Sequence, residues 1–236
     1  AADAETRRRS ARELVQAMCK HHERVTTTIC LAHAQTLLVD ASNWQSKDAF
    51  FHLVVALVVR AETQRGGVSR TSQAVDVADI FRSHVLPELQ NSDARHPVVV
   101  ADAVQFAATF RNQLPDAVVV DLVPLLAGFL RSPKVVVHTY AAYCLERCLH
   151  ARKLTRQHVE PHLTSLFDAL FSVIIDAPAE TSSWENEYSM RLVMRLLVLA
   201  DAAIAPVAKV VTDKLTKALA RVCANPRNPK FNHYLF

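Results

Sequence analysis

Glycine is scarce in this sequence, which has only Gly66, Gly67 and Gly128 among 236 residues. Loops that hold phosphate groups, and the fingerprint that binds dinucleotides, both need several glycines at fixed spacing, so the chain lacks both kinds of site. Few glycines also mean few tight turns. Half of the residues are hydrophobic, and alanine, leucine, valine and arginine are abundant, so the composition favours a mostly helical protein.

Long apolar runs are missing as well. The longest one, AFFHLVVALVV at residues 49–59, contains His52 and is too short to cross a bilayer. No signal peptide is visible at the start of the sequence. The sequence therefore predicts no membrane insertion.

The cysteines do not suggest a disulfide framework. Their number is odd, and they fall in apolar periodic segments, at Cys19, Cys30, Cys144, Cys148 and Cys223. This pattern is typical of buried, reduced thiols in a nuclear or cytosolic protein.

The charge pattern argues against nucleic acid as a partner. The formal charge is +4 at pH 7, and a basic tract at residues 7–9 opens the chain, but the two signs are mixed elsewhere. Proteins that bind nucleic acid usually carry a concentrated basic stripe with aromatic platforms, and no such stripe is visible.

Apolar residues recur at spacings of three and four almost throughout, and alternating strand patterns are rare, which predicts about eleven helices. The first is expected at residues 6–21, burying Leu14, Val15, Met18 and Cys19, and the second at residues 26–38. A third carries the apolar run after Asn43 and stops at Gly66 and Gly67.

A proline recurs in the second helix of successive helix pairs. The segments HVLPEL, DLVPLL, HVEPHL and AIAPVA contain Pro87, Pro124, Pro161 and Pro206, which are 37, 37 and 45 residues apart. A proline inside a helix costs about 3 kcal/mol unless the backbone bends or a helix starts there. We therefore expect a standard kink or helix start at this repeat position.

A two-helix unit recurring at roughly 40 residues is the signature of HEAT or armadillo repeats. The predicted fold class is all-α, an α-solenoid of stacked antiparallel helix pairs. We expect a single HEAT-repeat segment over residues 1–236 with about five repeats and part of a sixth. The expected bounds are residues 5–40, 43–90, 97–131, 132–176, 183–224 and 228–236.

His158, Glu160 and His162 lie within five positions and are ligand types that zinc prefers. On a helix, however, the two histidines share one face while Glu160 points to nearly the opposite side. The equivalent positions of other repeats hold different residues. We predict no metal site there or elsewhere in the chain, no cofactor, and no catalytic residue, since the chain lacks a nucleophile motif.

Two charge rows have regular helical spacing: Glu187, Arg191 and Arg195 in one helix, and Lys209, Asp213 and Lys217 in another. Either row can be a solvated helix face stabilised by i, i+4 pairs. The second row lies in the proline-bearing class of helices. Because one class of helices lines the concave face of a solenoid, Lys209, Asp213 and Lys217 are candidate protein-binding residues.

Six blocks of the sequence resemble one family in order and with compatible spacing. They are ETRRRSARELVQAMCK, NWQSKDAFFHLV, FRNQLP, VVVHTYAAYCLER, ENEYSMRLVMR and NPRNPKFNHYLF. They resemble the middle of the CAS-type exportins, which belong to the karyopherin-beta superfamily. The resemblance implies a central part of a longer HEAT superhelix without enzymatic activity. It also implies Ran-GTP and importin-alpha as partners, shuttling between nucleus and cytoplasm, and nuclear pore proteins as further candidate partners.

Two departures from that family stand out. Family members carry a longer insertion between the paired helices of a middle repeat, engaged in Ran binding, whereas the link at residues 151–158 is short. It is basic, with Arg152, Lys153 and Arg156, and these residues together with His158 and His162 are candidate protein-binding residues. Karyopherins are usually acidic, whereas this chain is basic. A generic HEAT or armadillo scaffold and an import-type karyopherin remain the alternatives.

Overall fold

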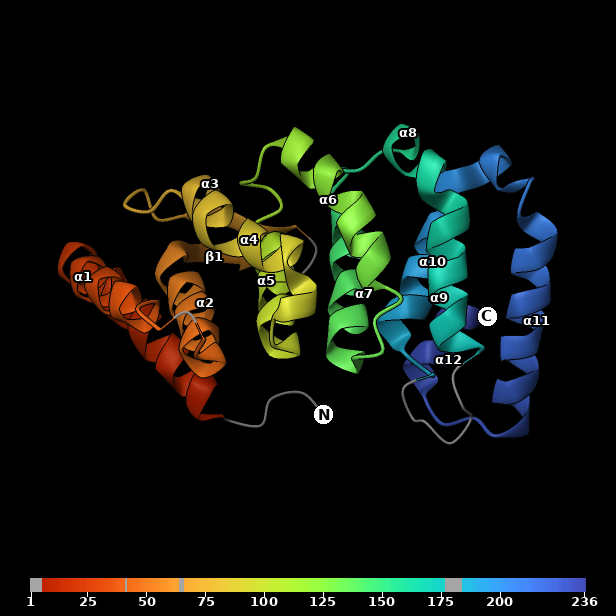
Figure 1. The fold of residues 1–236 in the computed structure, drawn as a ribbon, viewed down its shortest axis with the longest axis horizontal. Helices are drawn as coiled ribbons and strands as arrows, with labels where there is room; N and C mark the ends of the chain where they lie inside the picture. The colour runs from red at the N-terminus through yellow and green to blue at the C-terminus, as the bar shows by residue number, and fades with distance from the viewer. Residues whose placement is uncertain (1–5, 41, 64–65, 177–183) are drawn as a thin grey trace. The chain divides into compact units, whose positions relative to one another are not determined.

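The computed structural model describes residues 6–40, 42–63, 66–176 and 184–236. The regular secondary structure of the described residues is helical apart from one β-hairpin, which confirms the all-α class (Figure 1). The chain divides between Leu114 and Pro115 into two compact units. The helices of the predicted repeat at residues 97–131 fall in different units, and the expected repeat bounds 5 and 183 lie outside the described residues. The division into repeats therefore stays a prediction.

Among its described residues, the first unit contains seven helical segments and the hairpin. Its elements are α1 (Arg7–Leu37), α2 (Trp44–Val58), β1 (Val59–Thr63), β2 (Gly67–Thr71), α3 (Val77–Ile80), the π-helical turn η1 (Phe81–Val85), α4 (Leu86–Gln90), the 3-10 turn η2 (Ser92–Ala94) and α5 (Pro97–Thr109). Helix α2 packs against α1 and α5, and α4 also packs against α5.

Helix α1 consists of two helical stretches joined by a kink at His22, close to the break expected between the helices at residues 6–21 and 26–38. Thr6 caps its start by accepting a hydrogen bond from the backbone N–H of Arg9. The helix is bent at His22, whose φ of −136° and ψ of 46° are not helical. The expected burial of Leu14 and Met18 is wrong, because α1 packs mainly against α2 and leaves these two side chains 62% and 46% exposed.

The β-hairpin corrects the expectation that the third helix runs on to Gly66. Strands β1 and β2 are antiparallel, with Val59 opposite Thr71 and Thr63 opposite Gly67. Val59 and Val68 are buried, whereas Glu62 and Arg70 point to solvent. Burial falls along each strand from Val59 and Val68 toward the exposed residues, and the cross-strand pairing shows that the apolar run of α2 continues into a strand.

The segment that follows α5 fastens the hairpin in place. The side-chain amide of Asn112 donates to the carbonyl oxygen of Gly66 at 2.8 Å, and that of Gln113 donates to Val68 O at 3.0 Å. Gly67 has a φ of +76°, and a β-carbon there would collide with the guanidinium of Arg111. The FRNQ motif therefore positions the hairpin, and only glycine fits where the two segments meet.

The second unit contains helices in two neighbouring rows. Its elements are α6 (Asp116–Phe129), α7 (Val135–His150), α8 (Arg156–Val159), the 3-10 turn η3 (Glu160–His162), α9 (Leu163–Ile174), α10 (Glu187–Ala200), the 3-10 turn η4 (Asp201–Ile204), α11 (Ala208–Ala224) and α12 (Pro229–Leu235). Helix α10 packs against α7 and α12, while α9 packs against α6 and α11. Stacking of first helices on first helices and of second on second is the HEAT arrangement.

The recurring prolines adjoin irregular turns at three of their four positions. Pro87 follows the π-helical turn η1, Pro161 lies in the 3-10 turn η3, and Pro206 follows the 3-10 turn η4. Pro124, in contrast, lies inside the continuous helix α6. The expected kink or start is therefore confirmed at Pro87, Pro161 and Pro206, where a proline lacks the N–H that an α-helical turn needs.

None of the described helices is both long and apolar enough to cross a membrane.

Candidate protein-binding site

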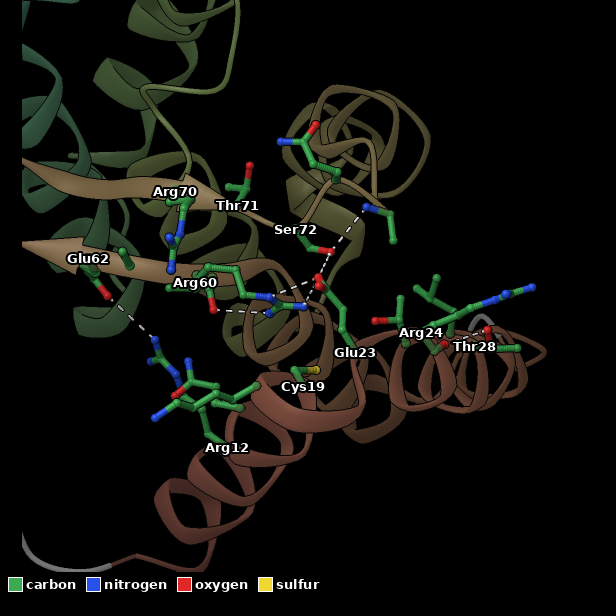
Figure 2. Close-up of a pocket in the computed structure, with 18 residues that line it drawn as sticks. Arg12, Cys19, Glu23, Arg24, Thr28, Arg60, Glu62, Arg70, Thr71 and Ser72 are labelled. Carbon is green, nitrogen blue, oxygen red and sulfur yellow. Dashed lines mark hydrogen bonds and ion pairs between the residues drawn. The ribbon is translucent and has the colours of Figure 1, made fainter.

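A groove of about 1190 Å³ lies in the first unit between α1 and the β-hairpin (Figure 2). Helix α1 supplies Arg12 and Lys20 to its lining, and the hairpin supplies Arg60 and Arg70. The two elements are far apart in sequence, so the groove exists only because the FRNQ segment and α1 hold the hairpin between them.

Glu23 joins the two walls of the groove. Its carboxylate accepts a hydrogen bond of 2.8 Å from the hydroxyl of Ser72 and bonds of 3.2 and 2.9 Å from Nε and Nη2 of Arg60. The hydrogen bond from Ser72, followed by those from Arg60, lowers the pKa of Glu23 because both favour the ionised carboxylate. Glu23 is therefore a structural anchor that fixes the hairpin on α1 at neutral pH.

The groove carries an excess of positive charge. Five of its lining residues are basic and two are acidic, and Glu62 faces Arg12 at 3.7 Å. Lys20 and Arg70 are exposed and have no carboxylate within 4 Å among the described residues. Because an exposed cation without a partner attracts negative charge, this surface fits an acidic segment of a partner protein.

The predicted binding residues at the start of the link form local contacts in the second unit. Arg152 has a φ of +59°, which turns the chain after α7. Lys153 Nζ donates to Asp116 Oδ1 at 2.5 Å, and Arg156 Nε donates to Glu160 Oε2 at 3.2 Å. Each of these two cations is therefore partly neutralised, although both ion pairs have at least one exposed member.

The histidines of the same link differ in their roles. Nδ1 of His158 accepts a hydrogen bond of 3.2 Å from the backbone N–H of Thr155 and so caps α8. His162 ends the 3-10 turn η3 and is half-buried. His158 is thus a helix-capping residue as well as a candidate contact, and its role as a contact stays a prediction.

Lys209, Asp213 and Lys217 lie exposed along α11, as the helical spacing predicts. Within the part of the chain that the structure describes, no ion pair within 4 Å joins them to one another, so they form no i, i+4 ladder. No hydrogen bond among the described residues joins this row to the basic link. Both sets remain candidate surfaces, at separate places in the second unit.

The buried carboxylate of Glu146, which the sequence did not indicate as important, contacts Arg191 and Arg195 of the charge row expected on α10. Glu146 on α7 accepts a hydrogen bond of 3.1 Å from Arg195 Nη2, and Nε of Arg191 lies at 3.2 Å from the same oxygen. Nε of Arg147 lies at 3.7 Å from the second oxygen. The expected pairing of Arg191 with Glu187 is wrong, since Glu187 instead faces Lys230 at 3.5 Å.

Two family models match the chain and together span it. The family described as Cse1 matches residues 1–145, and the family described as CAS/CSE protein, C-terminus, matches residues 145–236.

Similar proteins include Exportin-2 of Xenopus laevis, 34% identical over 242 aligned residues, and Exportin-2 of Homo sapiens, 35% identical over 246. Each alignment covers 99% of this chain and 25% of the relative. A solved structure described as the exportin Cse1 in its cargo-free, cytoplasmic state is also similar, with 30% identity and a TM-score of 0.89. That likeness covers 100% of this chain and 26% of the other. The chain thus spans about a quarter of the length of the curated relatives it matches.

Proposed function

This chain belongs to the Cse1 (CAS/CSE) family of exportins, which are nuclear transport receptors, and from that premise we propose that it works in the export of importin-alpha. In this proposal the protein that contains the chain binds importin-alpha together with Ran-GTP in the nucleus. It releases both in the cytoplasm after GTP hydrolysis, and so it shuttles between the two compartments.

The observation that carries the proposal is the sequence similarity to Exportin-2, which extends over 99% of the chain. The similar Cse1 structure is described as cargo-free and cytoplasmic. A receptor of that kind must pass between loaded and unloaded states, and stacked helix pairs supply the long surfaces that such loading requires. Ran-GTP and importin-alpha then stabilise the same loaded state, which makes their binding cooperative.

The β-hairpin is our candidate for the family's insertion. We expected that insertion at the link of residues 151–158, where it is missing, but the hairpin at residues 59–71 lies between α2 and the helical segment that begins with α3. We propose that the hairpin and the basic groove beside it contact an acidic face of Ran-GTP. In the second unit, the proposed protein contacts are Arg152, Lys153, Arg156, His158, His162, Lys209, Asp213 and Lys217.

The experiment is a pull-down with the whole protein, importin-alpha, and Ran loaded with either GTP or GDP. We expect importin-alpha to be retained strongly with Ran-GTP and weakly with Ran-GDP or without Ran. Equal retention in all three conditions would indicate a generic helical scaffold. Loss of importin-alpha on addition of Ran-GTP would indicate an import-type receptor, so either of these two results would refute the proposal.

A further inference from the structure

Three side chains of the first unit converge at the packing interface of α2 and α5. Asp48 and His52 are one turn apart on α2, and Asp102 on α5 faces them. One ligand atom from each residue lies within 4.8 Å of the other two. Nε2 of His52 is 3.5 Å from Asp48 Oδ1 and 3.8 Å from Asp102 Oδ1.

The two carboxylates are buried and only partly satisfied. The side chains of Asp48 and Asp102 are 10% and 9% exposed. When both carboxylates are ionised, Oδ1 of Asp48 and Oδ2 of Asp102 are buried without a hydrogen-bond donor, whereas a protonated Asp102 hydrogen-bonds to Asp48. A buried carboxylate oxygen without a donor is costly, so this place in the fold favours binding of a cation or a proton.

The charges on the surrounding elements do not balance the pair. From α1, Arg8 Nη2 donates to Asp48 Oδ2 at 2.5 Å, and Arg8 Nη1 lies 2.9 Å from His52 Nε2. One guanidinium therefore faces two carboxylates. Burial, followed by the charge of Asp48 and a hydrogen bond with it, raises the pKa of Asp102 to about 8, so a proton on Asp102 makes up the missing positive charge at neutral pH.

His52 presents a ligand nitrogen to the two carboxylates. Its Nε2 also lies 2.9 Å from Nη1 of Arg8, so displacement of Arg8 leaves this nitrogen for an ion. Nε2 points toward the two carboxylates and not away from them.

Solvent reaches the cluster through a second groove. This groove has a volume of about 570 Å³, lies between α1 and α2, and is lined by Arg8, Asp48 and His52 among others. Arg8 itself is 58% exposed, so its guanidinium can move out without disturbing the core. A hydrated ion therefore has access to Asp48 and His52, two of the three ligand residues.

We propose that Asp48, His52 and Asp102 form a binding site for a divalent transition-metal ion, with zinc as the best match, for which Arg8 is the competing cation. Zinc takes imidazole nitrogen and carboxylate oxygen at about 2.1 Å, which places tetrahedral ligand atoms roughly 3.4 Å apart. The separations of 3.5 and 3.8 Å meet that requirement with only small side-chain rotations. Magnesium is a poorer match because it prefers oxygen ligands and water.

A bound metal ion would cross-link α2, through Asp48 and His52, to α5, through Asp102. It would also displace Arg8, in the first turn of α1, from Asp48. The bound ion displaces the proton of Asp102 and supplies two positive charges for two carboxylates, whereas without metal Arg8 and that proton neutralise the pair. The inference does not depend on the proposed export function, since it concerns a site within the first unit and needs neither partner protein.

The test uses the protein without a polyhistidine tag, stripped of metal with EDTA and titrated with Co²⁺ as a spectroscopic probe. We expect one equivalent to bind, with visible d–d absorption that zinc abolishes and without a thiolate charge-transfer band. His52→Gln and Asp102→Asn should each weaken binding by about 100-fold or more, since each removes a ligand. Zinc should raise the melting temperature of the parent protein but not of these variants.

Two further variants separate this site from adventitious binding. His33→Gln changes an exposed histidine of α1 outside the cluster and should leave Co²⁺ binding unchanged. Arg8→Ala removes the competing cation and should tighten binding by about tenfold, the effect of one charged hydrogen bond. The proposal is overturned if no saturable equivalent of Co²⁺ binds, which is the result expected if Asp48 and Asp102 only share a proton. It is also overturned if Co²⁺ binding survives both His52→Gln and Asp102→Asn.

Discussion

The carboxylate of Glu146 lies among three guanidinium groups in the second unit. Its contribution to the free energy of unfolding can be measured by substitution. Only 1% of the residue is exposed, whereas the arginines around it remain partly exposed. Glu146→Gln keeps the shape but removes the charge, which leaves Arg191 and Arg195 facing each other without compensation. We expect a loss of about 3–5 kcal/mol in the free energy of unfolding, measured by urea denaturation.

Glu160→Gln is the matched control for that substitution. It breaks an exposed pair, since the side chains of Glu160 and Arg156 are 49% and 41% exposed. Such pairs contribute about 0–1 kcal/mol because water and salt screen them. Similar losses for the two variants would show that Glu146 is not the charge that holds α7 to α10.

The hairpin is the element whose placement depends most on one residue. Gly67→Ala puts a methyl group at a φ of +76° and against the guanidinium of Arg111, which is itself buried and bonded to Ala108 O at 2.6 Å. We expect a cost of about 1–3 kcal/mol and faster amide hydrogen exchange in β1 and β2, with α2 and α5 still protected.

Gly128→Ala supplies the comparison for the hairpin variant. A β-carbon at Gly128 meets nothing within 4 Å, and the residue lies inside α6. Alanine is about 1 kcal/mol better than glycine inside a helix, so this variant should be neutral or stabilising. Unchanged exchange in the hairpin of Gly67→Ala would mean that Arg111 moves aside and that the hairpin is not held by this close approach.

Periodicity predicts much at the scale of elements, and its errors have physical causes. The three- and four-residue spacing predicts the paired helices, and irregular turns do lie beside Pro87, Pro161 and Pro206. The hairpin escaped notice because Val59 continues the apolar run of α2, and a short apolar run fits a helix or a strand equally well. Its alternation from Val59 to Thr63, followed by Gly66, was the available signal.

The site residues are harder to predict because their partners are distant in sequence. Glu146 lies 49 residues from Arg195, and Asp102 lies far along the chain from His52. The expected ladder failed at Arg191 because a buried carboxylate gains more from a cation than an exposed one does. In contrast, Lys209 and Asp213 were expected on one exposed face of a helix from spacing alone, and the structure places them there.

At the scale of the whole molecule, the chain carries a formal charge of +4 at pH 7, and the groove beside the hairpin concentrates positive charge. Under the proposed function, this charge steers an acidic partner surface toward the hairpin before close contacts form. Raising the salt concentration from about 0.1 M to about 1 M shortens the screening length from about 10 Å to about 3 Å. We expect the association rate constant with Ran-GTP to fall by about tenfold or more, and the dissociation rate constant to change little.

Charge reversal in the groove tests whether this surface is the source of the steering. Lys20→Glu combined with Arg70→Glu should lower the association rate constant at low salt and flatten its salt dependence. Arg82→Glu, at a side chain 66% exposed on η1 and outside the groove, should leave that dependence unchanged. Stopped-flow fluorescence gives both rate constants. If the association rate constants of the double variant and the control depend on salt concentration in the same way, the groove does not guide the partner. The proposed contact of the groove with Ran-GTP would then be refuted, while the proposed export function would stand.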